Sequence, residues 1–377
     1  MRFLLAGGGT GGHVYPALAI AEELRRRQPD CELLYVGTED GLEARLVPAA
    51  GLAFKTVPSG RILGKKLGSK VGGAYRAALG VIAALGIIRR FRPDAAIGTG
   101  GFASGPAMLA AALRGVPVIL QEQNAYPGMT NRLLASLAGI ILVSHPQVAR
   151  GFPAWVRGRV LAVGNPVRPE VLEAERTAGA SFFGLDPQKT TVLVSSGSGG
   201  AKRLNQAALG LLPGVAAGQY QLIWATGSAY HRDTALAVAG RQSGTEGLRL
   251  LPYLERMPLG LAVADLVVAR AGAMTLAEIT ARGIPAVLVP SPNVVHNHQE
   301  LNARLLEGGG AAVVLADAGL TEELLAETVA AILGDRRRRE RMVAASRSLG
   351  RPGALGVIGG IVTAAAGGKG TRRALRP

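Results

Sequence analysis

The sequence predicts an α/β protein with two doubly wound domains, each a parallel sheet with helices on both faces. Short apolar segments alternate with amphipathic helical patterns along the chain, which is typical of consecutive βαβ units. The 377 residues also exceed what one ordinary core holds. A strand, a glycine-rich turn and a helix are predicted at residues 4–24 and again at 190–212, so the same arrangement starts twice.

The first domain is predicted over residues 1–164. Its expected strands are the apolar segments at 2–7, 31–37, 94–100, 116–121, 139–144 and 160–165. Asn165-Pro166 breaks regular structure, so we place the linker between the domains at residues 164–169.

The second domain is predicted over residues 165–349. Its expected strands begin at residue 190 and continue at 220–227, 248–254, 265–272, 284–290 and 311–315. The tail beyond Arg336 is basic and then rich in glycine and alanine, so we expect it to be partly disordered.

The composition restricts the compartment and the class of protein. The chain has one cysteine, Cys31, so it forms no internal disulfide, which fits a reducing compartment. Glycines interrupt the N-terminal apolar run before a signal peptide is complete. The longest strongly apolar run, 79–88, is about half of the ~20 residues that a spanning helix needs. We therefore expect a soluble or peripheral protein rather than an integral one.

The net charge of +16 predicts an anionic partner. Aromatic residues make up only 4% of the chain, and it has no zinc-finger or RNP-type motif, which argues against nucleic acid. No acidic residue occurs between Arg45 and Asp94, where basic and apolar residues are interleaved. This composition predicts contact with an anionic membrane surface, and the alternative is a solvated basic helix face over a core. The expected membrane-facing residues are Ile62, Leu63, Lys65, Lys66, Leu67, Tyr75, Leu79 and Ile82.

Two glycine-rich turns are candidate anion sites. Residues 7–12 satisfy the G-x-G-x-x-G pattern of dinucleotide-binding folds, but no acidic residue directly ends the next strand to hold a ribose. Glycines at a helix start leave N–H groups and the positive end of the helix dipole open. We expect Gly8–Gly12 and Ser196–Gly200 to receive negative charge or polar oxygens. The alternative is that both turns only pack a helix against a sheet.

His13 follows the first glycine turn and is a candidate general base. Within the first turn of a helix the dipole disfavours imidazolium, so a neutral ring is available to accept a proton. The alternative is a histidine that only satisfies a neighbouring carbonyl. No second histidine or cysteine lies at metal-ligand spacing, so we expect no metal site.

A third candidate site begins with the segment "ARAGAMTLAEI". Glu278 is suited to bind the two hydroxyls of a ribose, but Thr275 and Glu278 also have the spacing of a capping box. Downstream, Asn297, His298, Gln299 and Asn302 follow a predicted strand. Ligands of open parallel sheets bind at the carboxyl ends of strands, where these segments would meet.

Seven motifs in order resemble those of one family. They are "GGGTGGHVYPALAIAEEL", "GTGGFASGP", "EQNAYPGMTNRLLA", "VGNPVR", "GSGGAKRLN", "RAGAMTLAEI" and "HQELNA". The chain thereby resembles the MurG family of bacterial N-acetylglucosaminyltransferases over nearly its whole length. The resemblance implies two Rossmann-like domains facing a cleft, as in GT-B glycosyltransferases, with residues 350–377 packing back on the first domain.

The resemblance also implies an activity. GlcNAc would pass from UDP-GlcNAc to the 4-hydroxyl of undecaprenyl-diphosphate-linked MurNAc-pentapeptide, turning lipid I into lipid II with inversion and with no metal at the donor phosphates or other cofactor. The first domain would take the lipid acceptor and the second the donor. The enzyme would be peripheral, on the cytoplasmic face of the membrane, with no nucleic-acid partner.

The family's UDP-GlcNAc contacts correspond to a set of residues in both domains. In the family the uracil is held by backbone at Leu254, the ribose by Glu278 and the GlcNAc hydroxyls by Gln299, while Ser198 faces the phosphates. The full set is Thr10, Gly11, Gly12, Asn124, Arg168, Ser198, Leu254, Ala273, Met274, Thr275, Leu276, Ala277, Glu278 and Gln299.

Two positions depart from the family pattern. Gly199 replaces a glutamine found in many members, and Phe102 replaces a tyrosine found in some, so neither side chain can hydrogen-bond. His13 is the first candidate for the base that deprotonates the acceptor, and Glu122 the second. Three other functions stay open, namely a sugar-nucleotide epimerase, a nicotinamide-dependent oxidoreductase and a basic adaptor.

Overall fold

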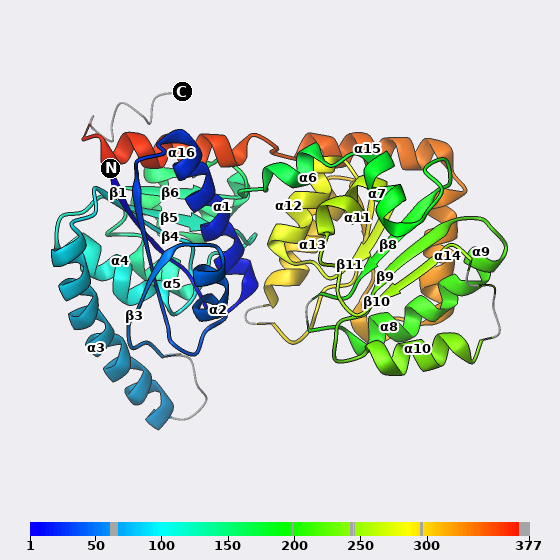
Figure 1. The fold of residues 1–377 in the computed structure, drawn as a ribbon, viewed down its shortest axis with the longest axis horizontal. Coiled ribbons are helices and arrows are strands. Elements are labelled where there is room, and N and C mark those ends of the chain that lie inside the picture. The colour runs from blue at the N-terminus through cyan, green and yellow to red at the C-terminus, as the bar shows by residue number, and fades with distance from the viewer. Residues whose placement is uncertain (61–66, 198, 242–243, 245, 295–296, 369–377) are drawn as a thin grey trace. The chain divides into compact units, whose positions relative to one another are not determined.

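The computed structural model describes residues 1–60, 67–197, 199–241, 244, 246–294 and 297–368. The chain forms two compact units. The first comprises Met1–Val167 together with Gly353–Pro377, and the second comprises Arg168–Pro352. Each unit is an α/β structure in its own right, with helices on both faces of a parallel sheet (Figure 1).

The first unit contains a seven-stranded parallel sheet in the order β3-β2-β1-β4-β5-β6-β7. The strands are β1 (Arg2–Ala6), β2 (Glu32–Gly37), β3 (Ala53–Thr56), β4 (Ala95–Gly98), β5 (Val118–Glu122), β6 (Ile140–Val143) and β7 (Val160–Ala162). Six of them coincide with predicted strands. The sequence analysis missed β3 because the segment AFKT is short, half polar and mostly exposed, and it is recognised as a strand by its pairing with β2.

Two sets of helices cover the faces of this sheet. The set on one face packs α1 (Gly11–Arg27), α2 (Leu42–Ala49) and α16 (Ala354–Ala366) on Phe3 and Leu5 of β1. Leu4 and Ala6 point to the other face, as the period of two along a strand requires. That face carries α3 (Leu67–Phe91), α4 (Ser104–Leu113), α5 (Met129–Leu134) and the 3₁₀ helices η1 (Pro146–Gly151) and η2 (Ala154–Arg159).

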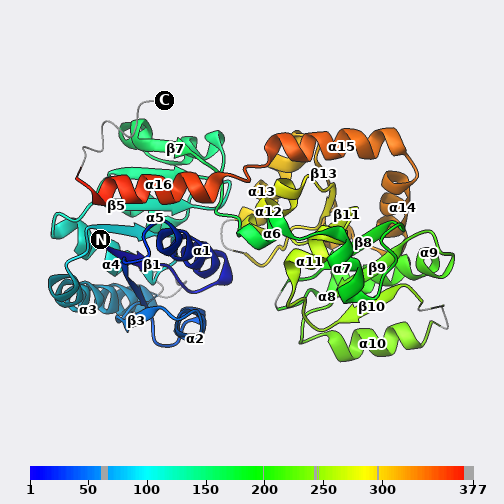
Figure 2. The ribbon, with the colours of Figure 1, turned by 45° about the horizontal axis from the view of Figure 1, so that its top comes forward.

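The tail beyond Arg336 forms the helices α15 (Arg336–Leu349) and α16, so it has regular structure as far as residue 366. Partial disorder stays an expectation for residues 369–377, which lie outside the described residues. Among the described residues, one helical stretch, Arg336–Ala366, is apolar and long enough to cross a membrane by length and composition, with 33% of its apolar window buried. Within this stretch, α16 has one buried side, because Leu355, Ile358 and Val362 lie in the core beside α1. Figures 1 and 2 both show α16 against the face of the first sheet that α1 covers.

The second unit contains a six-stranded parallel sheet in the order β10-β9-β8-β11-β12-β13. The strands are β8 (Thr191–Ser195), β9 (Gln221–Ala225), β10 (Leu248–Leu251), β11 (Leu266–Ala269), β12 (Ala286–Leu288) and β13 (Ala312–Val314), all within predicted segments.

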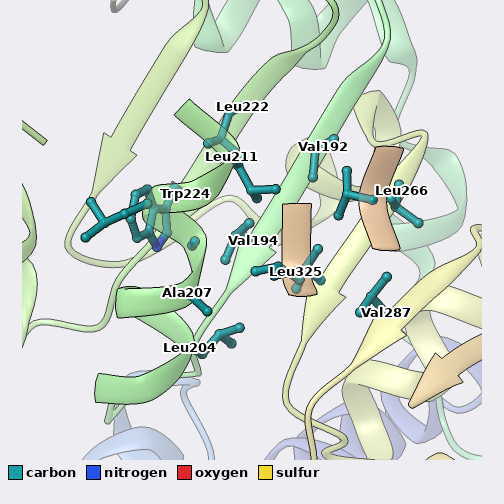
Figure 3. Close-up of a cluster of buried hydrophobic side chains, with 14 of the residues drawn as sticks. Val192, Val194, Leu204, Ala207, Leu211, Leu222, Trp224, Leu266, Val287 and Leu325 are labelled. Atoms are coloured by element: carbon teal, nitrogen blue, oxygen red, sulfur yellow. The ribbon is translucent and has the colours of Figure 1, made fainter. Parts of the chain in front are cut away.

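The helices of the second unit also cover both faces of its sheet. On one face, side chains of α8 (Lys202–Ala208) and α14 (Glu322–Leu333) join Val192, Val194, Leu222 and Trp224 in one buried cluster, with Trp224 at one side of it (Figure 3). This cluster also includes residues of η3 (Leu209–Leu211), α9 (Leu212–Ala216), α10 (His231–Ala239) and α15 (Arg336–Leu349). The remaining helices are α6 (Pro169–Glu173), α7 (Arg176–Phe183), α11 (Met257–Val263), α12 (Ala273–Arg282), α13 (His298–Gly308) and η5 (Asp317–Gly319).

Each sheet has a point where the strand order reverses. In the first unit β1 lies between β2 and β4, and in the second unit β8 lies between β9 and β11. Chain segments leave neighbouring strands in opposite directions there, which opens a crevice at the carboxyl edge of such sheets. The two glycine-rich turns follow β1 and β8, so each lies at the switch point of its own sheet.

Candidate functional site

The first switch point brings the turn after β1 against the turn after β4. The Gly8 N–H donates to the Gly100 carbonyl at 3.3 Å, and a Cβ on Gly101 would lie 2.1 Å from the Gly8 oxygen. Gly9, Gly100 and Gly101 all have positive φ. Glycine is therefore required here both for backbone conformation and for close approach of two loops.

Some backbone N–H groups of the first glycine turn donate within the protein, and others have no acceptor among the described residues. Gly8 and Gly9 donate within the protein, whereas the N–H groups of Thr10, Gly11 and Gly12 form no hydrogen bond within the part of the chain that the structure describes. Helix α1 begins at Gly11, so its dipole is directed at these groups. The turn thus packs loops together and also keeps open donors.

Glu43 belongs to the first turn of helix α2. Its side chain contacts the glycine turn after β1 and is fully buried. One carboxylate oxygen accepts from the Gly9 N–H at 3.1 Å, and the other from the N–H and hydroxyl of Thr38 at 3.1 and 2.7 Å. A Cβ on Gly8, Gly37 or Gly41 would collide with this side chain. The sequence analysis missed Glu43 because it looked for an acid directly ending β2. The surrounding glycines were the available signal.

His13 is half-buried in the first turn of α1, as predicted. Its Nδ1 lies 2.9 Å from the Thr99 carbonyl and 3.1 Å from Oε1 of Gln123. The described residues form no hydrogen bond to its Nε2. The imidazole therefore contacts a carbonyl through Nδ1, as one interpretation expected, while Nε2 stays open and the role of general base stays a prediction.

Glu122, the second candidate base, ends β5 and is 1% exposed. One oxygen accepts from the N–H and the side-chain amide of Asn124 at 3.0 and 3.2 Å. The other accepts from the Gly128 N–H at 2.8 Å and from Asn131 at 2.9 Å. Four donors occupy this carboxylate, which thereby fixes the loop that carries Asn124.

At the second switch point the turn after β8 lies against the turn after β9, since a Cβ on Gly227 would lie 2.2 Å from the Cα of Gly200. Asn205 holds the β8 turn, because its Oδ1 accepts from the Ser196 hydroxyl at 2.7 Å and its amide donates to the Thr226 carbonyl at 2.8 Å. A Cβ on Gly199 would meet open space, so this position borders a free surface. Ser198 lies outside the described residues.

Glu278 lies in α12, immediately after the β11 turn, and is 8% exposed. The helix begins at Ala273 with Gly272 as its N-cap, so Thr275 and Glu278 lie inside the helix and form no capping box. Arg168 approaches the carboxylate at 3.3 Å. Burial raises the pKa of Glu278, and the Arg168 guanidinium acts in the opposite direction.

The predicted polar residues after β12 hold the loops around α12. The side-chain oxygen of Gln299 accepts from the Ser291 N–H at 2.9 Å, and the Asn302 amide donates to the Ala271 carbonyl at 3.1 Å. Leu276 and Leu254 are buried, whereas Ala273, Met274, Thr275 and Ala277 are half-buried at the same helix start. Arg270, which the sequence analysis did not single out, pairs with Asp317 at 2.6 Å at this edge.

The remaining predicted residues belong to the first unit. Thr10 and Gly12 are exposed, and Gly11 and Asn124 are half-buried. Phe102 lies against Gly9, where a Cβ would lie 2.7 Å from its ring. Tyr75, Leu79 and Ile82 are exposed on α3. Ile62, Leu63, Lys65 and Lys66 lie outside the described residues, and the side chain of Leu67 is not described. Among the described residues, no three His, Cys, Asp or Glu are grouped to hold a metal ion.

Comparison with known proteins identifies the family. The glycosyltransferase family 28 N-terminal domain matches residues 3–143, and the C-terminal domain of the same family matches residues 191–354.

Full-length relatives support the same assignment. Two UDP-N-acetylglucosamine--N-acetylmuramyl-(pentapeptide) pyrophosphoryl-undecaprenol N-acetylglucosamine transferases align over 95% of the chain. The protein from Symbiobacterium thermophilum is 46% identical with 94% of its length covered, and that from Moorella thermoacetica is 45% identical with 97% covered.

Solved structures agree with the sequence relatives. The crystal structure of Acinetobacter baumannii MurG superposes with a TM-score of 0.75 at 28% identity, covering 96% of this chain and 99% of that one. A UDP-N-acetylglucosamine 2-epimerase from Listeria monocytogenes has a TM-score of 0.67 at 14% identity, with 96% of both chains covered, which is a likeness of fold alone. The chain therefore belongs to glycosyltransferase family 28, among the MurG-type N-acetylglucosamine transferases.

Proposed function

We propose that this glycosyltransferase transfers GlcNAc from UDP-GlcNAc to the 4-hydroxyl of lipid-linked MurNAc-pentapeptide, giving lipid II. The proposal rests on the chemical groups found at the switch points of the two sheets. In the first unit, the glycine turn after β1 has open N–H groups and leads into the helix that carries His13. In the second unit, the turn after β11 leads into the helix that carries the buried carboxylate of Glu278. The first unit is suited to acceptor chemistry and the second to a sugar nucleotide.

The donor is assigned to the second unit. Glu278 would bind the ribose hydroxyls, with Arg168 opposing the rise in the carboxyl pKa that burial causes, and backbone at Leu254 would bind the uracil. Gln299 would bind the GlcNAc hydroxyls, and Ser198 with its glycine turn would face the phosphates. The contacts from Thr10, Gly11, Gly12 and Asn124 stay predictions, as do those from residues 273–277.

The reaction is a single displacement at the anomeric carbon. The acceptor oxygen forms the new bond to C1 as the C1–O bond to the β-phosphate breaks, and UDP leaves with the electron pair. Inversion at C1 follows from attack opposite the leaving group. His13 takes the hydroxyl proton, and a positioned base of this kind contributes about 10²–10⁴-fold. Preorganised N–H groups stabilise the charge that grows on the diphosphate. Because four donors occupy Glu122, we assign it to holding the Asn124 loop rather than to the base.

The membrane-facing surface is assigned to α3. Tyr75, Leu79 and Ile82 recur at helical spacing on its exposed side, while Ala84 and Ile88 bury the opposite side in the core. A helix with apolar side chains on both sides and no acidic residue is suited to an anionic bilayer surface. We therefore propose peripheral association with the cytoplasmic face of the membrane.

A transfer assay tests the reaction. We expect purified protein to transfer GlcNAc from UDP-GlcNAc to a lipid I analogue in detergent or vesicles, and His13→Ala to lower kcat with little change in the KM for UDP-GlcNAc. Absence of turnover by the unaltered protein under these conditions would overturn the proposal. Incubation without acceptor separates an epimerase, which would alter UDP-GlcNAc by itself.

Vesicle flotation tests the membrane surface. We expect Ile82→Asp to weaken binding to vesicles that contain anionic phospholipid, because a carboxylate replaces an apolar side chain at the lipid surface. Leu236→Asp on α10 is the matched control, since both side chains are 66% exposed. Equal binding by the two variants would remove α3 from the proposal.

A further inference from the structure

We propose that Gln123 is a positioning residue that, with the Thr99 carbonyl, holds His13 as the tautomer protonated on Nδ1. Nε2 is then the ring nitrogen that accepts the acceptor's proton. The inference rests on the proposed function, because it names the reacting atom of the base proposed there. It is carried by a chain of three buried amides, Gln123, Gln121 and Asn165, that ends on the imidazole.

The orientation of each amide follows from backbone carbonyls, which can only accept. The Asn165 NH₂ group donates to the Gln123 carbonyl at 3.0 Å, so the Asn165 oxygen accepts from Nε2 of Gln121 at 3.1 Å. The oxygen of Gln121 therefore faces Nε2 of Gln123, which donates to it.

The last amide of the chain is fixed in the same way. Nε2 of Gln123 also donates to the Thr99 carbonyl at 2.8 Å, and the Gln121 carbonyl, another acceptor, lies 3.2 Å from the same nitrogen. A reversed Gln123 would place an oxygen against these acceptors with no proton between them. Its Oε1 is thereby directed at His13, 3.1 Å from Nδ1.

The imidazole faces two acceptors through one nitrogen. Nδ1 lies between the Thr99 oxygen at 2.9 Å and the Gln123 oxygen, and neither of these carries a proton to give. Nδ1 must therefore carry the ring's proton, which leaves the lone pair of neutral His13 on Nε2. The Nδ1–H bond persists after Nε2 takes a proton, so the ring need not reorient during catalysis.

Burial makes this arrangement resistant to reversal. Gln121, Gln123 and Asn165 are 0%, 2% and 6% exposed, so a flipped amide has no water to replace its partners. Gly100 and Gly101 flank the ring, because a Cβ on either would lie within 3.2 Å of it. The network thus fixes both the tautomer and the plane of His13.

The tautomer is measurable without any substrate. In protein labelled with ¹⁵N in its histidine rings, a His13→Gln variant assigns the His13 signals among the five histidines. In the neutral ring, we expect Nδ1 of His13 to resonate as a protonated nitrogen and Nε2 as an unprotonated one. Free histidine prefers the opposite tautomer, so the outcome is distinctive.

Two matched variants test the positioning role. Gln123→Met keeps the shape of the side chain but removes its polar atoms, and we expect kcat to fall about 10–100-fold with the KM for UDP-GlcNAc unchanged. Gln221→Met is the control, because Gln221 is a buried glutamine of the second unit that bonds Asp186 at 2.8 and 2.9 Å.

The outcomes separate the inference from the proposed function. A proton on Nε2 of neutral His13, or a kcat in Gln123→Met no lower than in Gln221→Met, overturns the positioning role. If His13→Ala retains full kcat while the spectrum shows the Nδ1–H tautomer, the base assignment fails and the tautomer stands. The spectrum of the unaltered protein decides the matter even if Gln123→Met does not fold.

Discussion

At the scale of single residues, Glu278 combines a charge with burial. Removal from water raises the pKa of its carboxyl, and the nearby Arg168 guanidinium partly offsets this. A carboxyl whose pKa is raised takes up its proton at a higher pH than an exposed one. Because the ionised form is the better acceptor for ribose hydroxyls, donor binding should depend on pH.

We expect the KM for UDP-GlcNAc to rise as the pH is lowered from about 8 toward about 5, since Glu278 is protonated before an ordinary carboxyl would be. Glu278→Gln should flatten this dependence at a raised KM. Arg168→Met should move the rise to higher pH, and Arg241→Met, which breaks a surface ion pair with Glu322, is its control. A KM profile identical in Glu278→Gln and unaltered protein would contradict the ribose assignment.

Glu43 is a second residue whose role is decided by its surroundings. Glu43→Gln would direct an amide N–H at the N–H of Gly9 or Thr38, leaving buried donors opposed. We expect the free energy of unfolding to fall by about 1–3 kcal/mol, as for other buried donors without partners. Chemical denaturation measures this, and Glu39→Gln on an exposed side chain is the control. Equal stability of the two variants would show that the loop does not need the carboxylate.

At the scale of elements, α16 is joined to α1 by a hydrogen bond as well as by its buried apolar side chains. Glu23 of α1 is buried and bonds Arg26 and Arg27, and the Arg27 guanidinium donates to the Gly356 carbonyl of α16 at 2.7 Å. The hydrogen bond from Arg26 is the largest influence on the pKa of Glu23 and lowers it, and Arg27 adds to this against the effect of burial. The ion pairs therefore form part of the helix contact itself.

Two glycines of α16 allow a matched comparison. A Cβ on Gly359 would lie 2.6 Å from Cγ of Glu23 and 2.9 Å from Nε of Arg27, whereas one on Gly356 would lie 3.6 Å from its nearest neighbour. We expect Gly359→Ala to destabilise the protein by about 1–3 kcal/mol through overpacking. Gly356→Ala should be neutral or stabilising by up to about 1 kcal/mol, because alanine favours the helix. Thermal unfolding of both variants measures the difference, and equal shifts would contradict the close contact.

At the scale of the whole molecule, the first unit is discontinuous in sequence. The chain completes Met1–Val167, forms the second unit and then returns through α16 to the first. Leu355, Ile358 and Val362 fill the core beside α1, so that core is incomplete until the last helix is made.

Removal of residues 353–377 should therefore destabilise one unit and spare the other. We expect faster amide hydrogen exchange in β1 of the truncated protein and unchanged exchange in β8, because the buried side chains of α16 belong to the first unit's core among the described residues. Mass spectrometry of the exchanged peptides measures both at once. Uniformly faster exchange in both strands would mean that the two units do not unfold separately.

The alternation of apolar strands with helical patterns was enough to predict two parallel sheets and nearly every strand, because buried parallel strands are continuous apolar runs. The strand β3 was not predicted, because its four residues are not apolar enough to be recognised without a partner strand. The tail showed the reverse problem. Its glycines and alanines indicate disorder in isolation, but small residues let α16 lie close to α1.

The sequence by itself determined the fold class, the family motifs and the two glycine turns, since these depend on residues near one another in the chain. Tertiary structure decided which partners each motif residue has. It directs four hydrogen-bond donors at the Glu122 carboxylate and places Glu278 inside its helix rather than in a capping box. It also brings the Thr99 and Gln123 oxygens to one nitrogen of His13. These partners come from distant strands, and only the folding of the sheet, which joins strands from far along the chain at one edge, sets which atoms meet.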